Sequence, residues 1–303
     1  MHPPGSPHPA NDFHSGTPVT KSAQRVAMVT DSTAYFPDGA VDSLNIRVVP
    51  LRITIGTHTT TDGVDVTASD VAIALRARVS VTTSRPSPAQ FAEVYQSCLD
   101  AGAQRVVSVH LAAALSGTWE SAALAAQDFE HGVVRVVDSR STAMALGYAV
   151  MAAAQRAAEG ASAAEVQGTA TETVDRTRTL FYVDSLEYLR RGGRIGTAAA
   201  LLATSLSVKP LLQMVEGRIV PLEKVRTSTK AIARLVQLTA QGAGDGPVDA
   251  AVHHLAAAAR ADQVATALRA AIPQLGELHI AELGPVVGAH LGPGVIGTVV
   301  VRR

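Results

Sequence analysis

The sequence is short of cysteine, of net charge and of long apolar runs. Its 303 residues include a single cysteine, Cys98, so no disulfide can form within the chain. The 26 basic side chains are matched by 26 acidic ones, whereas a nucleic-acid-binding protein usually carries a basic excess or stripe. The longest apolar stretch, Ala143 to Ala154, is far shorter than the roughly 20 residues that span a membrane. We therefore expect a cytoplasmic protein that binds no nucleic acid and does not insert stably into a membrane.

Motifs for metals and nucleotides are also lacking. The 10 histidines are scattered, and no two have the spacing that places a zinc-binding pair on one helix face. His253 and His254 are neighbours on an expected strand, where adjacent side chains point to opposite faces. The segment Gly292 to Gly297 matches G-x-G-x-x-G, but a dinucleotide site needs a helix after the motif, and only six residues follow it. We predict no metal, no cofactor and no catalytic residue in this chain.

The length favours two domains, because a single hydrophobic core rarely serves 303 residues. The first 23 residues are polar, contain several prolines and lack the apolar centre of a secretory signal, which predicts a disordered tail over residues 1–23. We expect an N-terminal domain over residues 24–165 and a C-terminal domain over residues 166–303. Two domains leave a cleft between them, which is a common place for a small-molecule site.

Short Val-rich runs alternate with helical patterns in the N-terminal domain. Runs that are apolar on both faces are typical of buried parallel strands. Four such runs are Arg25–Thr30, Ile46–Leu51, Arg105–His110 and Val133–Val137. Between them, Ser87 opens a helix with the spacing of a capping box. The alternation predicts an α/β domain with a doubly wound, mainly parallel sheet.

The C-terminal domain has a different pattern. Lys209–Val215 and Arg218–Val225 are expected strands, joined by a tight turn at Glu216-Gly217. Ser228 or Thr229 is the expected cap of the helix that follows. Further strands and one more helix complete an expected α+β domain with a mixed sheet.

Hydroxyl and carboxyl side chains follow the expected strands of the first domain. In a doubly wound sheet the carboxyl ends of the strands face the ligand crevice. Asp31-Ser32 and Asp138-Ser139 stand at such ends and are typical of helix caps or crevice scaffolding. Ser116-Gly117-Thr118 and the hydroxyl cluster that begins at Thr82 each precede a helix. Their spacing alone fits a helix cap as well as a site for an anion.

Eight motifs occur in the order found in one known family. They are Val29-Thr-Asp-Ser-Thr33, Thr83-Ser-Arg-Pro-Ser-Pro88, Leu115-Ser-Gly-Thr118, Asp138-Ser139, Tyr188-Leu-Arg-Arg-Gly-Gly-Arg-Ile195, Lys209-Pro210, Lys224-Val-Arg-Thr227 and His290-Leu-Gly-Pro-Gly294. From about residue 26 to its end the chain resembles the DegV family, the lipid-binding group that includes the fatty-acid-carrying subunits of bacterial fatty acid kinase. Any one motif is weak, but the ordered set is specific.

The resemblance implies a ligand and a set of site residues. One long-chain fatty acid, such as palmitate, stearate or oleate, is expected between the two domains of a monomer. Its carboxylate is expected on the hydroxyls of Thr83 and Ser116. The resemblance places Ser84, Arg194 and His290 in the head-group region.

The resemblance also implies a partner. Arg226, in the Lys224-to-Thr227 motif, is expected to serve phosphoryl transfer with a separate fatty acid kinase, which makes an acyl-phosphate from the presented acid. In three places the chain departs from residues that are frequent in the family, at Arg85, Trp119 and Ala289. Arg85 and Ala289 lie at the polar end of the implied site, and Trp119 bears on the width of the tunnel that holds the acyl tail.

The chemistry of such a site is sound without the resemblance. A buried carboxylate needs hydrogen-bond donors, because an unpaired buried charge is very costly. Burying a tail of about 14 methylenes contributes roughly 11 kcal/mol before ordering costs. Two alternatives stay open: a serine-dependent lipid or acyl-ester hydrolase that uses Ser116 and His290, and a lipid-binding protein without a kinase partner.

Overall fold

The computed structural model describes residues 25–201 and 209–303, so the expected tail over residues 1–23 lies outside the described part. The first sheet is parallel throughout, in the order β2-β1-β6-β7. Its strands are β1 (Val26–Asp31), β2 (Ile46–Val49), β6 (Arg105–His110) and β7 (Val134–Asp138). The short helix α1 (Ala40–Ser43) leads into β2.

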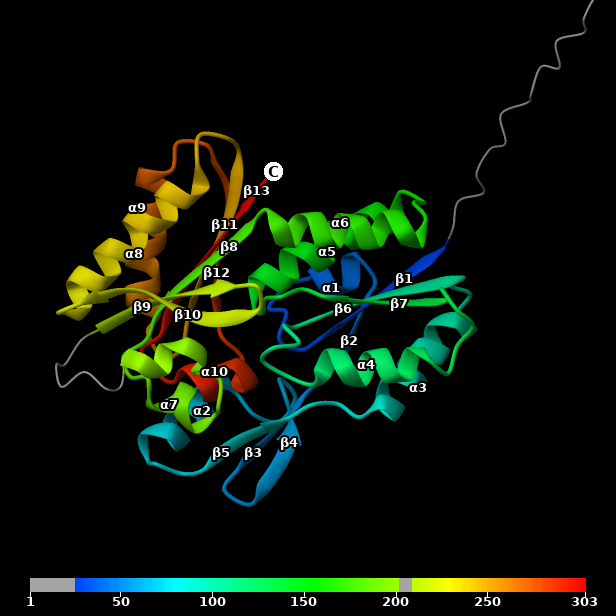
Figure 1. Ribbon diagram of the computed structural model, residues 1–303, viewed down its shortest axis with the longest axis horizontal. Coiled ribbons are helices and arrows are strands. Elements are labelled where there is room, and N and C mark those ends of the chain that lie inside the picture. The colour runs from blue at the N-terminus through cyan, green and yellow to red at the C-terminus, as the bar shows by residue number, and fades with distance from the viewer. Residues whose placement is uncertain (1–24, 202–208) are drawn as a thin grey trace, which may run out of the picture.

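Helices cover both faces of this sheet (Figure 1). They are α3 (Pro88–Asp100) and α4 (Thr118–Ala126) on one face, and α5 (Met144–Ala158) and α6 (Ala163–Asp175) on the other. Neighbouring residues of one strand therefore enter different cores: Met28 packs with α5 and α6, and Val29 packs with α3 and α4. The predicted doubly wound parallel sheet is confirmed.

The second sheet is mixed. Within the described residues its order is β10-β9-β8-β13-β11-β12, and every neighbouring pair is antiparallel except β11 with β12. Its strands are β8 (Thr177–Tyr182), β9 (Lys209–Val215), β10 (Arg218–Val225), β11 (Val248–His254), β12 (Leu275–Glu282) and β13 (Ile296–Arg302). The helices α8 (Ser228–Ala243) and α9 (Ala258–Ala271) cover one face, as Figure 1 shows. The predicted α+β domain with a mixed sheet is confirmed.

Local signals at helix ends explain several of these bounds. The Ser87 hydroxyl accepts from the Gln90 amide while Gln90 bonds back to the Ser87 amide, which is the expected capping box. The expectation for α8 was wrong by one residue. Its N-cap is Thr227, whose hydroxyl accepts from the Lys230 amide, because Thr227 is the last residue with extended backbone.

The helix α5 is packed between the two sheets. Leu146 and Val150 belong to the core of the first sheet, whereas Met144 and Tyr148 pack against Val299 and its neighbours in the second. The next helix, α6, runs through the expected domain boundary at residue 165 and packs against β6 and β7. The chain passes to the second sheet after Arg176, where β8 begins.

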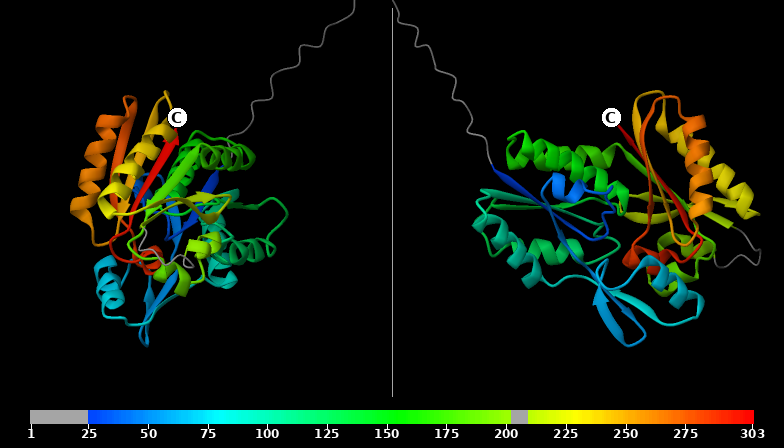
Figure 2. Two further views of the ribbon diagram at one scale, coloured as in Figure 1. Left: turned by 60° about the vertical axis from the view of Figure 1, so that its left-hand side comes forward. Right: turned by 180° about the vertical axis from the view of Figure 1, so that it is seen from behind.

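A small lobe, residues 52–84, was not foreseen. It holds an antiparallel sheet in the order β4-β3-β5 together with one helix. The elements are β3 (Arg52–Ile55), β4 (His58–Thr61), α2 (Ala68–Arg76) and β5 (Val81–Ser84). Figure 1 and the right-hand view of Figure 2 place the lobe below both larger sheets.

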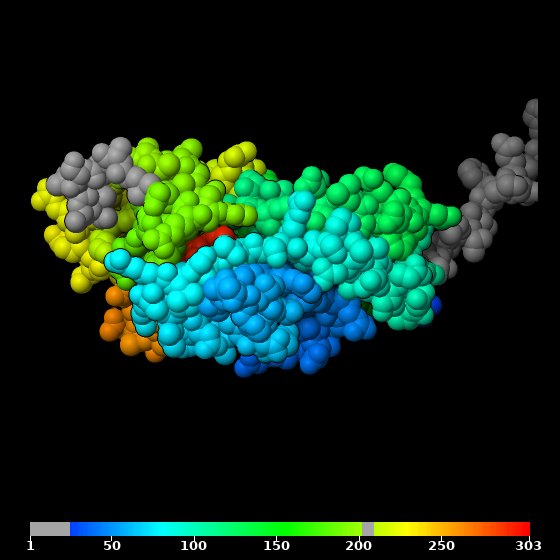
Figure 3. All heavy atoms as spheres, turned by 90° about the horizontal axis from the view of Figure 1, so that it is seen from below, coloured from blue at the N-terminus to red at the C-terminus, as the bar shows by residue number. Residues whose placement is uncertain are grey.

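The small lobe packs on α10 (Pro285–Leu291), a helix near the end of the chain. Ile53 and Val71 of the lobe share a buried cluster with Val286 of α10. The buried Asp62 carboxylate joins them further, because it accepts from the Val286 amide at 3.3 Å and from the Ser32 hydroxyl at 2.6 Å. Seen from below, red atoms of the C-terminal segment are visible between the lobe and the neighbouring yellow-green atoms (Figure 3).

Two short elements complete the described fold, α7 (Glu187–Arg191) and the 3-10 helix η1 (Gly196–Leu201). Among the described residues, no helix combines the length and the apolar character that a membrane crossing requires.

Candidate functional site

A cavity lies where the first domain, the small lobe and the inner face of the second sheet meet. The space inside it, including the part that opens to solvent, amounts to about 860 Å³. Most of its wall is apolar. The apolar side chains are Leu51, Leu111, Leu115, Ala143, Phe181, Leu189, Met214, Ile219, Leu283, Val286, Val287, Leu291, Val295 and Val299.

Thr83 and His290 form one polar contact of the cavity wall. Thr83 lies on β5 of the small lobe, and His290 lies in the last turn of α10. The Thr83 Oγ1 atom and the His290 Nε2 atom are 2.8 Å apart. When the imidazole carries its proton on Nε2, it donates to Thr83 and leaves the hydroxyl proton free to donate elsewhere.

Ser116 reaches the same cavity from the loop between β6 and α4. Its hydroxyl accepts from the Thr118 amide at 3.3 Å and lies 2.9 Å from the Thr118 hydroxyl. The two interpretations of this residue are therefore compatible, since Ser116 bonds the first turn of α4 and lines the cavity at once.

Arg194 supplies the positive charge of the cavity wall. Its Nε donates to the Leu115 carbonyl at 2.8 Å, which ties the α7–η1 segment to the loop that carries Ser116. Burial, and then the charge of Arg194, lower the pKa of His290 to about 4. The imidazole is therefore neutral near pH 7, and Arg194 is the charged group that faces it.

A glycine makes room for this imidazole. A Cβ on Gly192 would stand 2.2 Å from His290 Nδ1, closer than any side chain allows. The next residue, Gly193, has a positive φ of 71°, which suits a glycine in a turn. The close approach of Gly192 to His290 was missed, because it depends on two segments that the fold brings together.

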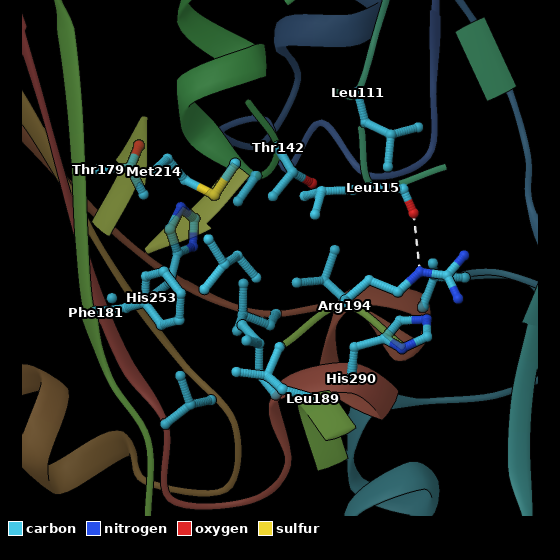
Figure 4. Close-up of a pocket in the computed structure, with 18 of the residues that line it drawn as sticks. Leu111, Leu115, Thr142, Thr179, Phe181, Leu189, Arg194, Met214, His253 and His290 are labelled. Carbon is cyan, nitrogen blue, oxygen red and sulfur yellow. Dashed lines mark hydrogen bonds between the residues drawn. The ribbon is translucent and has the colours of Figure 1, made fainter. Parts of the chain in front are cut away.

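The end of the cavity away from Arg194 presents no charged side chain among the described residues. Figure 4 shows Arg194 and His290 on one side and Phe181, His253, Thr179 and Met214 on the other. His253 donates from Nδ1 to the Ala281 carbonyl and accepts the Met144 amide on Nε2. Burial lowers its pKa to about 4. Both ring nitrogens are thus used by the backbone, and the imidazole meets the cavity as a neutral surface.

Two expected site residues lie away from this wall. Ser84 is exposed and is not among the residues that line the cavity, because neighbouring side chains on a strand point to opposite faces and Thr83 takes the inner one. Arg226 is exposed between β10 and the cap of α8 and also does not line the cavity.

The arrangement for a serine hydrolase is incomplete at this cavity. His290 Nε2 contacts Thr83 and not Ser116, and the Ser116 hydroxyl contacts Thr118. A serine, a histidine and an aspartate do line up elsewhere, where Ser108 contacts His110 at 2.6 Å and His110 contacts Asp31 at 3.0 Å. All three are fully buried, so this network holds β1 to β6 and no substrate reaches it.

Asp31 and Asp138 act as scaffolding, as one of the sequence interpretations held. Asp31 accepts from the Leu111 amide at 2.9 Å, and Asp138 accepts from the Ala113 amide at 3.1 Å. Both bonds fix the loop that leads to Ser116. In the described residues, no three His, Cys, Asp or Glu side chains are placed to hold a metal ion together.

The fold and the cavity define a class: an α/β protein of two main sheets with a largely apolar site between them. The family model described as "Uncharacterised protein, DegV family" matches residues 25–303. The chain belongs to the DegV family, as its motifs predicted.

Relatives of known sequence or structure agree with this assignment. A DegV domain-containing protein from Streptomyces coelicolor is 50% identical over 281 residues, which are 93% of this chain and 100% of that one. A fatty-acid-binding DegV family protein from Thermus thermophilus is 33% identical, with a TM-score of 0.88 over 92% of this chain and 100% of that one. DegV, a fatty acid binding protein from Bacillus subtilis, is 30% identical, with a TM-score of 0.83 over 92% and 100%.

Proposed function

We propose that the chain binds one long-chain fatty acid without transforming it, with the carboxylate between Thr83 and Ser116 and the acyl tail in the apolar cavity. One observation carries the proposal: the wall of a largely apolar cavity includes the hydroxyls of Thr83 and Ser116, together with the neutral imidazole of His290 and the charged side chain of Arg194. The structures from T. thermophilus and B. subtilis, both described as fatty acid binding, support it.

The polar groups suit a carboxylate. The hydroxyls of Thr83 and Ser116 donate to its oxygens, because their other bonds can be made as acceptors. Arg194, in the wall of the same cavity, offsets the negative charge, and His290 remains neutral. The head group thus fixes orientation, while the tail contributes most of the affinity through buried methylenes.

Mass spectrometry of lipids extracted from the purified protein tests the proposal. We expect one intact long-chain acid per chain in the wild type and a strong loss in the double variant Thr83→Val with Ser116→Ala. Ser84→Ala is the matched control, because it removes a hydroxyl next to Thr83 that does not line the cavity. Normal lipid content in the folded double variant would refute the assignment of these hydroxyls.

The same preparations test the hydrolase alternative. A hydrolase would turn over acyl esters and lose that activity in Ser116→Ala. The contacts of Ser116 and His290 with Thr118 and Thr83 argue against it.

We further propose that the chain works in the cytoplasm and presents its fatty acid to a separate fatty acid kinase, with Arg226 on the phosphoryl-transfer side. Arg226 is exposed, and no ion pair involves it within the described residues, so its charge is available to a partner or a phosphate. Arg226→Ala should leave lipid content unchanged and impair acyl-phosphate formation with a cognate kinase. A lipid-binding protein without such a partner would show no acyl-phosphate with any kinase supplied.

A further inference from the structure

A second hollow lies behind the end of the cavity that is farthest from Arg194. We call it the outer pocket. It is lined by Arg140, Ser141, Ala145, Val174, Asp175, Thr177, Arg178, Thr179, Gln213, Met214, Val215 and Glu216. Thr179 and Met214 line both the cavity and the outer pocket. Because these two residues border both hollows, they form part of the partition between the cavity and the outer pocket.

The partition is held by packing. Among the described residues, no hydrogen bond joins the side chains of Thr179 and Met214 to each other or to Thr142, whose buried Oγ1 has no partner. Figure 4 shows the Met214 side chain extending toward Thr142 inside the cavity. Methionine is unbranched and has three rotatable bonds, so its shape adapts and its removal breaks no polar contact.

The backbone behind this partition is fixed. Arg140 of the first domain bonds Glu216 at 2.9 Å and also bonds Asp175. Glu216 begins the turn that follows β9, the strand that carries Met214. The ion pairs hold this turn against the first domain, so the position of Met214 is set by its strand and only its side chain adapts.

The outer pocket differs from the cavity in chemistry. Arg140, Arg178, Asp175 and Glu216 make its surface charged, and the methyl end of an alkyl chain gains little by leaving an apolar wall for such a surface. An acyl tail should therefore stop at Met214.

We propose that Met214, supported by Thr179, is the residue that limits the length of the acyl chain that the protein binds. The proposal rests on the proposed fatty-acid binding. Shortening Met214 joins the cavity to the outer pocket and admits a longer tail, and a bulkier, stiffer side chain there excludes tails that the wild type accepts.

Competition among saturated fatty acids of increasing length tests the proposal. The test uses four lipid-free proteins: the wild type, Met214→Ala, Met214→Phe and the control Met151→Ala. Each is loaded with an equimolar mixture of the saturated fatty acids, and the bound acids are extracted and identified and quantified by mass spectrometry. Met151 is a methionine of α5 that does not line the cavity.

In Met214→Ala the most abundant bound acid should lengthen by about two to three carbons, because the substitution removes three heavy atoms. In Met214→Phe it should shorten, and in Met151→Ala it should stay as in the wild type. The same length distribution in wild type and both Met214 variants would overturn the proposal while leaving fatty-acid binding intact. If one of the two Met214 variants fails to fold, the change in bound chain length in the other variant tests the proposal. Absence of bound acid from the wild type itself would overturn the proposed function and this inference together.

Discussion

Thr83 Oγ1 and His290 Nε2 lie 2.8 Å apart although 207 residues separate them in the sequence. The contact joins the small lobe to α10 at the wall of the cavity. It therefore serves the fold and the site together, since a lobe that shifted on α10 would also part the imidazole from the hydroxyl.

Thr83→Val tests this contact, because valine keeps the shape of threonine and removes the hydroxyl. We expect the free energy of unfolding of the lipid-free protein to fall by about 1 kcal/mol and fatty-acid retention to fall as well. Thr82→Val is the matched control on the exposed side of the same strand. A double-mutant cycle with His290→Phe, measured by urea unfolding, should give a coupling energy of about 1 kcal/mol; a coupling of zero would contradict the contact.

Gly192→Ala should disturb the same site from the other side. The added methyl would stand 2.2 Å from His290 Nδ1, so the ring must move away from Thr83. We expect about 1–3 kcal/mol of destabilisation from overpacking and several-fold weaker fatty-acid retention in a titration of the lipid-free protein. Gly168→Ala, in the interior of α6 with no atom within 4 Å of the new Cβ, should be neutral or stabilising. Equal retention in the two variants would refute the packing argument.

The buried His290 predicts the sign of a pH effect. Its pKa is about 4 in the folded protein and near 6.5 in the unfolded chain, so between these values the unfolded chain binds a proton that the folded chain does not. The free energy of unfolding must therefore fall as the pH falls from 6.5 towards 4. His290→Gln should reduce this loss, by on the order of 2 kcal/mol between about pH 7 and about pH 4.5.

Urea unfolding of the lipid-free proteins at the two pH values measures this difference. His58→Gln, which removes an exposed imidazole from the small lobe, is the matched control. A wild type and a His290→Gln variant with parallel pH dependence would show that His290 is not the group responsible.

Alanine substitutions at Gly217 and Gly63 distinguish the cost of backbone strain from the cost of packing. Their φ angles are nearly equal, +74° and +75°, but a Cβ on Gly217 would lie 3.3 Å from Ala112 Cβ and a Cβ on Gly63 would meet nothing within 4 Å. Each change to alanine should cost about 1–2 kcal/mol for the left-handed backbone. Gly217→Ala should cost about 1 kcal/mol more, because its turn is docked on the first domain. Thermal unfolding of both variants measures the difference, and equal losses would mean that the docking tolerates the methyl.

The larger elements could be predicted from sequence because their signals are local. Val-rich runs marked β1 and β6, and a capping box marked the start of α3. The small lobe was missed because its strands have four residues each and are rich in threonine, as at His58–Thr61. Such strands lack both the apolar run and the clear alternation that distinguish a strand from a loop.

The candidate site was predictable only in part, for a related reason. The motif order singled out Thr83, Ser116, Arg194 and His290, and the fold places all four on one cavity. His253 was missed as a cavity residue. The sequence indicated that His253 and His254 point to opposite faces of their strand, but it did not indicate which of the two faces lines the cavity. Which face of a mixed sheet lines a cavity depends on the packing of distant elements, and no local pattern records it.

The position of α5 between the two sheets has a consequence for how the molecule comes apart. Leu146 and Val150 stabilise one core, and Met144 and Tyr148 stabilise the other. If either sheet unfolds, one face of α5 loses its packing, and this loss weakens the packing of α5 on the other sheet. The two halves should therefore melt in one cooperative transition, with the calorimetric and van't Hoff enthalpies in agreement. The two domains should therefore not unfold independently, although they occupy separate stretches of the chain.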